Sequence, residues 1–182
     1  ASYVWSESKG TVDNTGSGSV TGRFFEHPAR SLVNSYGLMS NDRTHEIKIF
    51  GGYTIPKIEV ALNAYYRAIS GTPWGYYTRA SSSALNWSFP PIFSSARVVY
   101  YEPRSAHRMD MLHQVDLRIE KSFKYDVQKF GIFMDIGNLF NTATITGIQN
   151  RYPSVLIDGN TVMPGSPTAI QGARQITIGG RW

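Results

Sequence analysis

The sequence has no cysteine, which excludes disulfide bonds and cysteine-ligated metal sites. It has no apolar run near the roughly 20 residues that a membrane-spanning helix needs. Charged residues make up only 17% of the chain, which is below the soluble average. No basic and apolar signal peptide opens the chain, so we expect either a cytosolic protein or a chain that lacks its true N-terminus.

Aromatic residues and glycine replace the missing charge. The chain holds eleven Tyr, nine Phe, four Trp and 17 Gly among 182 residues, a composition that favours a β-barrel over a helical membrane protein. The net charge is +5, but the Lys and Arg residues are scattered singly along the sequence. Without a basic cluster, we expect no nucleic-acid partner.

The last nine residues, 174–182, alternate between polar and apolar side chains. On a strand, Ile176, Ile178 and Trp182 share one face, while Thr177 and Arg181 share the other. One face suits lipid and the other suits water, as in the closing strand of a membrane barrel. On this segment alone, an edge strand of a soluble sandwich is an equal alternative.

Five further segments show the two-residue period of half-buried strands. The clearest are 113–123, 130–138, 58–69 and 45–54, and the first residues form a weaker strand with Tyr3 and Trp5 on one face. In each strand the polar set lies opposite an almost purely apolar set. We expect the polar set to line a barrel lumen, the alternative being the solvated face of a soluble sheet. Its charged members are Glu46, Lys48, Glu59, Arg67, Asp116, Arg118, Glu120, Asp135 and Arg181.

Connection lengths predict the topology. The segments 55–57 and 124–129 are short, whereas 10–42, 71–112 and 141–173 are long, rich in turn-forming residues and expected to be unstructured. Outer-membrane barrels have short periplasmic turns and long extracellular loops. We therefore predict one all-β domain over 1–182, an antiparallel up-and-down transmembrane β-barrel segment of about six spanning strands that forms an incomplete barrel. We place the strand-like run 98–102 inside the second long loop.

Aromatic residues gather at two places along this topology. At or beside the predicted periplasmic ends they form a girdle, and they are Tyr53, Phe123, Tyr125, Phe130 and Trp182. Others lie in the loops, where they are candidates for stacking on a sugar or peptide ligand. These are Trp74, Tyr76, Tyr77, Trp87, Tyr100, Tyr101 and Tyr152. Packing between loops is an equally good explanation of the second set.

No constellation points to an enzyme, so we expect neither catalytic residues nor a cofactor. His107, Asp110 and His113 are the only cluster with metal-ligand residue types, and their place in a loop favours solvated side chains over a metal site. There is no nucleophile elbow. The Gly-Ser-Gly run at 16–18 lacks the strand-loop-helix context of a phosphate cradle.

Several motifs resemble one family. They are Asp-Leu-Arg-Ile-Glu-Lys-Ser-Phe at 116–123 and, at hairpin spacing, Asn-Leu-Phe-Asn at 138–141, with Asn-Asp-Arg-Thr-His at 41–45, Ser-Gly-Thr-Pro at 70–73 and the aromatic end. They resemble TonB-dependent outer-membrane receptors, in particular large ones with an N-terminal carboxypeptidase-regulatory-like domain. The terminal Gly-Gly-Arg-Trp departs from the family's more frequent Tyr-x-Phe or Arg-Phe.

The resemblance implies the last six strands of a barrel of about 22 strands in a bacterial outer membrane. Six strands cannot close a barrel, so we expect this chain to be a C-terminal fragment of a longer protein. It implies as partners the membrane lipid, the protein's own N-terminal plug domain, TonB, the barrel-assembly machinery and an imported ligand. It also implies that Ile176, Ile178 and Trp182 form the terminal assembly signal. The alternatives are a passive outer-membrane channel or adhesin barrel, and a soluble all-β carbohydrate-binding module.

Overall fold

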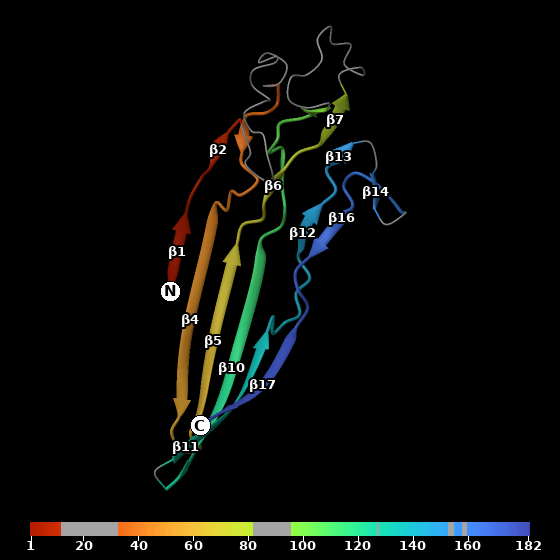
Figure 1. The fold of residues 1–182 in the computed structure, drawn as a ribbon. Coiled ribbons are helices and arrows are strands. Elements are labelled where there is room, and N and C mark those ends of the chain that lie inside the picture. Colours follow the sequence, from red (N-terminus) through yellow and green to blue (C-terminus); the bar gives the residue numbers. More distant parts are fainter. Residues whose placement is uncertain (12–32, 82–95, 127, 153–154, 158–159) are drawn as a thin grey trace.

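The computed structural model describes residues 1–11, 33–81, 96–126, 128–152, 155–157 and 160–182 (Figure 1). Throughout these ranges the secondary structure consists of β-strands, most of them in antiparallel pairs. No helix in the described ranges could cross a bilayer.

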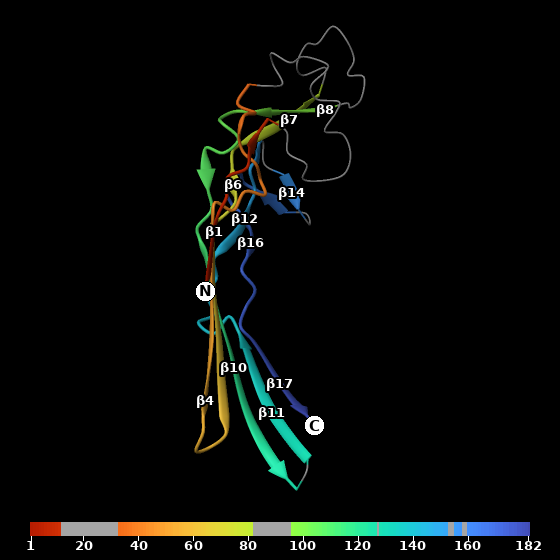
Figure 2. The same cartoon turned by 90° about the vertical axis from the view of Figure 1, so that its left-hand side faces the viewer.

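The main body is one six-stranded sheet in which strands follow one another in chain order and every neighbouring pair is antiparallel. Figures 1 and 2 show a single curved layer whose first and last strands are not paired with each other. The prediction of an incomplete up-and-down sheet of six strands is confirmed. The strands are β1 (Ser2–Trp5), β4 (His45–Ile55), β5 (Val60–Ile69), β10 (Leu112–Tyr125), β11 (Gln128–Gly137) and β17 (Gln175–Arg181).

The register places most of the large aliphatic side chains of the sheet on one face. Leu117 of β10 lies opposite Ala64 of β5 and Ile136 of β11, and Ile136 lies opposite Ile176 of β17. No second layer covers this face in the described part of the chain. On this face Ala68 is 1% exposed, whereas Ile178, on the same face as Leu117, is 72% exposed.

The two short turns lie at one end of the sheet. Between β10 and β11 only two residues remain, because these strands are longer than the sequence predicts, and Asp126 has a positive φ of 53°. Asp tolerates this left-handed conformation in tight turns. Between β4 and β5, Glu59 has a φ of 51°. Glu59 therefore belongs to the turn and not to the strand that we predicted from residue 58.

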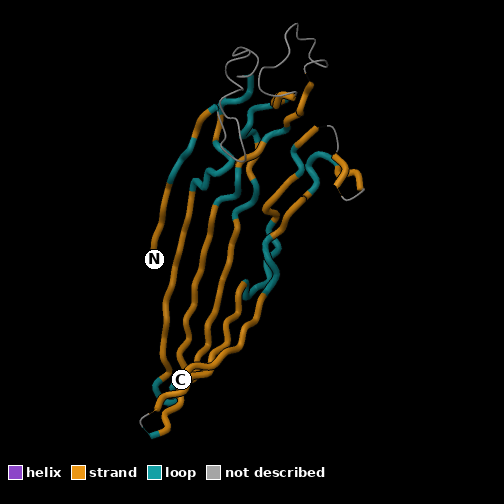
Figure 3. Tube along the Cα trace, viewed as in Figure 1, coloured by secondary structure: helices purple, strands orange, loops and turns teal. Residues whose placement is uncertain are grey.

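The long connections contain strands of their own, which corrects the expectation that they are unstructured (Figure 3). Pairs form within each connection, and β13 runs parallel to β7, joining the second connection to the third. The run 98–102 falls mostly in β8, outside the main sheet, as predicted. The pairs are β2 (Lys9–Gly10) with β3 (Gly37–Leu38), β6 (Pro73–Trp74) with β9 (His107–Arg108), β7 (Tyr77–Ser81) with β8 (Ala96–Tyr100), β12 (Ile145–Ile148) with β16 (Pro167–Ile170), and β14 (Val155–Ile157) with β15 (Asn160–Val162), while β13 is Arg151–Tyr152.

Candidate functional site

Charged side chains on the polar face of the sheet form ion pairs within and between strands. The guanidinium of Arg118 donates to both carboxylate oxygens of Asp135 at 2.6 and 2.8 Å, and it lies 4.4 Å from the centroid of the Phe133 ring. Glu46 accepts ion pairs from Lys48 at 3.0 Å and Arg67 at 3.2 Å. Arg118 and Asp135 lie directly opposite each other, and opposite charges in that position stabilise the pairing of strands. Lys48 shares β4 with Glu46, and Arg67 reaches Glu46 diagonally from β5. The structure thus gathers these predicted residues on one face.

A third pair reaches over a strand. Arg181 of β17 forms an ion pair with Glu120 of β10, and Gly131 of the intervening β11 lies opposite Arg181. A Cβ atom at Gly131 would lie 3.1 Å from Arg181 Nε and 3.3 Å from Glu120 Oε1, so a larger residue there would require these two side chains to shift. Glu59 stands apart in its turn, where its carboxylate lies 3.7 Å from Lys124 Nζ.

A shallow groove of about 580 Å³ lies over the middle of the polar face. It spans β4, β5, β10, β11 and β17, and its lining combines aromatic rings with charged and amide groups. The lining residues that lie on the polar face are Phe50, Tyr65, Asn63, Asp116, Arg118, Asp135, Gln175 and Thr177. This surface could hold a polypeptide segment through hydrogen bonds and stacking.

Loop aromatic residues that are distant in sequence form a connected cluster. Trp74 contacts Tyr76 edge-to-face with centroids 5.1 Å apart, and Tyr76 contacts Tyr152 in the same manner at 6.3 Å. Tyr152 in turn contacts Tyr101 at 5.9 Å. Tyr101 is 61% exposed and Tyr152 is 50% exposed, so the cluster presents open ring surface. His107 stacks on Trp74 at 4.5 Å, a member that the sequence did not single out as a binding residue.

The carboxylate of Glu102 contacts two members of this aromatic cluster. Glu102 accepts a hydrogen bond from the Tyr76 backbone N–H at 2.8 Å and lies 3.0 Å from His107 Nε2. Tyr77 and Tyr100 form a neighbouring tilted pair at 6.2 Å. Of the predicted loop aromatics, Trp87 lies outside the described residues. Trp74, Tyr76, Tyr101 and Tyr152 form one cluster, and Tyr77 with Tyr100 forms a separate pair. This arrangement suits both ligand stacking and loop packing.

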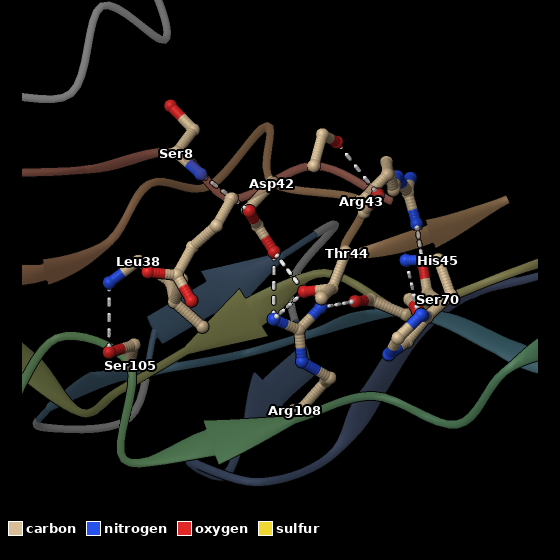
Figure 4. Close-up of polar contacts among 12 residues, drawn as sticks. Ser8, Leu38, Asp42, Arg43, Thr44, His45, Ser70, Ser105 and Arg108 are labelled. Carbon is tan, nitrogen blue, oxygen red and sulfur yellow. Dashed lines mark hydrogen bonds and ion pairs between the residues drawn. The ribbon is translucent and has the colours of Figure 1, made fainter. Parts of the chain in front are cut away.

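A buried polar network ties the loops to the sheet (Figure 4). Asp42 is 2% exposed, and its carboxylate accepts hydrogen bonds from Ser8 N–H at 2.8 Å, the Thr44 hydroxyl at 2.7 Å and Arg108 Nη2 at 2.8 Å. Arg108 also donates to the Gly71 carbonyl at 2.7 Å. Burial alone would raise the pKa of Asp42, but these donors outweigh it and hold the pKa below its ordinary value.

The Asn-Leu-Phe-Asn motif forms a second hydrogen-bond network, at the start of β10 and β17 and the end of β11. Asn138 is 3% exposed with φ 52°; its N–H donates to Asp116 at 2.8 Å and its side-chain amide donates to the carbonyls of Thr142 and Gly172. Asn141 accepts from the Arg174 N–H at 2.9 Å. Asn is among the few non-glycine residues that visit this backbone region readily. The motif therefore has a structural reason to hold these residue types.

The His107, Asp110 and His113 group does not assemble. His107 contacts Glu102 and Trp74, whereas His113 contacts Tyr66. Within the described ranges no three metal-ligating side chains gather at one point. At the other end of the molecule, Ile176 and Ile178 lie on the apolar face of β17, and Trp182 follows that strand fully exposed.

These features define the class of the chain as an all-β, barrel-like sheet segment with one apolar and one polar face. The chain is similar to the TonB-dependent transporter Oar of Myxococcus xanthus, with 27% identity over 145 residues. The matched region covers 77% of this chain but only 12% of that relative. No family model matches the chain, and no solved structure matches it. The similarity supports a relationship to TonB-dependent receptors.

Proposed function

We propose that this chain is part of the barrel wall of a TonB-dependent outer-membrane receptor that imports a ligand. The observation that carries the proposal is the uncovered apolar face of a single-layer sheet. A large apolar surface without a covering layer needs an apolar environment, and hydrocarbon supplies one. The opposite face, with its ion pairs and groove, suits a lumen that holds water or a plug domain.

The similarity to a named TonB-dependent transporter supports energy-coupled import over a passive channel or adhesin barrel. A soluble carbohydrate-binding module would bury its apolar face in a core between two layers. The described residues place Ile132, Ile176 and Ile178 in the open instead, at 55%, 60% and 72% exposure. This distribution weighs against the soluble alternative.

Fractionation of the full-length protein tests the membrane half of this proposal. We expect it in the outer-membrane fraction, resistant to carbonate extraction, with a mobility on electrophoresis that changes on boiling. Recovery in the soluble fraction would refute the proposal. Co-purification with the periplasmic domain of TonB tests the coupling half, and a folded outer-membrane protein that does not bind TonB would leave the passive barrel as the function.

A further inference from the structure

Two tyrosine–histidine pairs lie on the apolar face at the loop end of the sheet. The Tyr3 hydroxyl lies 2.8 Å from His45 Nδ1, and the stacked rings have centroids 6.1 Å apart. Tyr66 and His113 repeat this arrangement at 2.9 Å and 6.2 Å. Each pair is a diagonal contact between neighbouring strands, β1 with β4 and β5 with β10. The lumen and its groove use neither pair.

Each pair offers a hydrogen-bond donor to its surroundings. When the tyrosine hydroxyl donates to Nδ1, the neutral imidazole carries its proton on Nε2. Neither Nε2 atom has a hydrogen-bond partner among the described residues. An N–H group that meets an apolar medium without an acceptor is costly. The acceptor must therefore come from outside the sheet.

The depth of the pairs places them at a headgroup region. From His113 to Phe123, β10 spans about 33 Å, and a tilt of about 40° reduces this to a height of about 25 Å. Phe123 lies opposite Phe130 beside the short turn, where the sequence predicts an aromatic girdle. Because the apolar band of outer-membrane barrels is about 25 Å tall, the two pairs lie where the band ends on the loop side.

The polar face carries charges of both signs, whereas the apolar face holds no carboxylate among the described strand residues. The strand carboxylates, Glu46, Asp116, Glu120 and Asp135, all share the polar face. On the apolar face the described strand residues with basic nitrogen atoms are His45, His113 and, at the turn end, Lys121. An acceptor with negative charge is therefore favoured beside the two histidines.

Arg43 adds a permanent positive charge next to the first pair. Its guanidinium donates to the Ser70 carbonyl at 2.9 Å, and Ser70 Oγ accepts the His45 N–H at 3.0 Å (Figure 4). Arg43 forms no ion pair with any residue that the structure describes. The small side chains of Ala68 and Ser70 lie between the two imidazoles, which are two strand spacings apart and offset by two residues, a separation of roughly 12 Å.

We propose that Arg43 with His45, and His113 beside them, bind the phosphates of two neighbouring lipid headgroups in the leaflet on the loop side. Tyr3 and Tyr66 are positioning residues that orient the imidazoles. The acyl chains would run down the apolar face over Ile47, Ile49, Val115 and Leu117. This inference rests on the proposed function, because it requires the apolar face to meet lipid.

Lipid selectivity in bilayers tests the site directly. The full-length protein is reconstituted in phosphatidylcholine bilayers with either spin-labelled phosphatidic acid or spin-labelled phosphatidylcholine, and electron paramagnetic resonance gives the fraction of each label immobilised by protein. We expect a preference for phosphatidic acid of roughly threefold, since exposed charged contacts contribute modestly. The preference falls to about one in the H45A/H113A double variant. Tyr53→Ala, on the same face near the turn, is the matched control and keeps the preference.

The same samples separate the possible failures. Protein that does not insert refutes the proposed function, whereas inserted wild-type protein without a preference refutes the lipid site alone. Equal preference in wild type and the histidine double variant also overturns it. Loss of preference on adding inorganic phosphate at constant ionic strength indicates a site for soluble anions and overturns the lipid assignment. If the double variant does not fold, Y3F/Y66F and Arg43→Gln carry the test, and an unchanged preference in both overturns the proposal.

Discussion

Leu117 and Arg118 are adjacent residues on opposite faces of β10, and a substitution at each of them tests which face of the sheet meets lipid. Leu117 lies opposite Ala64 and Ile136, all on the apolar face. It follows His113 by four residues, which places it roughly 10 Å below the headgroup level, near the middle of the apolar band. An arginine on the lipid face at this depth costs roughly 2–4 kcal/mol.

The matched change is Arg118→Gln. Arg118 is exposed, with 45% of its side chain accessible, and its contacts with Asp135 and Phe133 are those of a hydrated surface pair. Such pairs contribute little, and glutamine keeps a polar group on the same face. We therefore expect a much smaller loss of stability than for Leu117→Arg.

Urea unfolding of the full-length protein in lipid vesicles measures both changes. The expected result is a large drop in midpoint for Leu117→Arg and a midpoint close to wild type for Arg118→Gln. Equal losses from the two variants, or a larger loss from Arg118→Gln, would refute the assignment of the apolar face to lipid.

Three further changes test topology, the loop anchor and the register. Because the chain has no cysteine, Met163→Cys and Lys57→Cys each introduce one labelling site. A membrane-impermeant maleimide added to intact cells should label Met163→Cys and not Lys57→Cys. The reverse labelling pattern would show that the predicted topology is inverted. Asp42→Asn should cost about 1–3 kcal/mol near neutral pH, since it weakens a buried ionic network. The folded-state pKa of Asp42 is lowered, so the stability that its carboxylate contributes is complete above its unfolded pKa of about 3.9 and is lost as the pH falls below that value. In urea titrations, the difference in unfolding free energy between wild type and Asp42→Asn should therefore shrink from pH 6 to pH 3. A constant difference would contradict the network. Gly179→Val should lower the free energy of unfolding by about 1–3 kcal/mol, because a Cβ atom at this position collides with the Phe133 ring. Adding Phe133→Ala should recover most of this stability. If the second substitution does not compensate, the β11–β17 register is contradicted.

The sheet could be predicted because its signal is local. Alternation along each strand fixes which residues share a face, and the short turns fix which strands are neighbours. The Arg118–Asp135 pair follows from this register alone. The error at Glu59 arose because Ile58 and Glu59 continue the alternation of β5, while the backbone has already entered a turn with positive φ.

The loops could not be predicted in the same way, because their structure depends on contacts between segments far apart in the sequence. The pairing of β13 with β7 joins residues more than seventy positions apart, and Glu102 meets Tyr76 only through such folding. Asp42 carried a signal in the Asn-Asp-Arg-Thr-His motif, but its partner Arg108 lies in another loop. The Tyr–His pairs are diagonal contacts that alternation places on one face without showing that the side chains meet.

The most direct test of the central claim is the accessibility of β10 to lipid and to water. Single cysteines introduced at each position from 113 to 123 of the full-length protein, spin-labelled and reconstituted in bilayers, report their collision rates with oxygen and with a water-soluble nickel chelate. The account predicts a two-residue period, with Val115, Leu117 and Ile119 accessible to oxygen and Gln114, Asp116, Arg118 and Glu120 accessible to the chelate. Equal accessibility to the chelate on both faces, or the opposite phase, would contradict it.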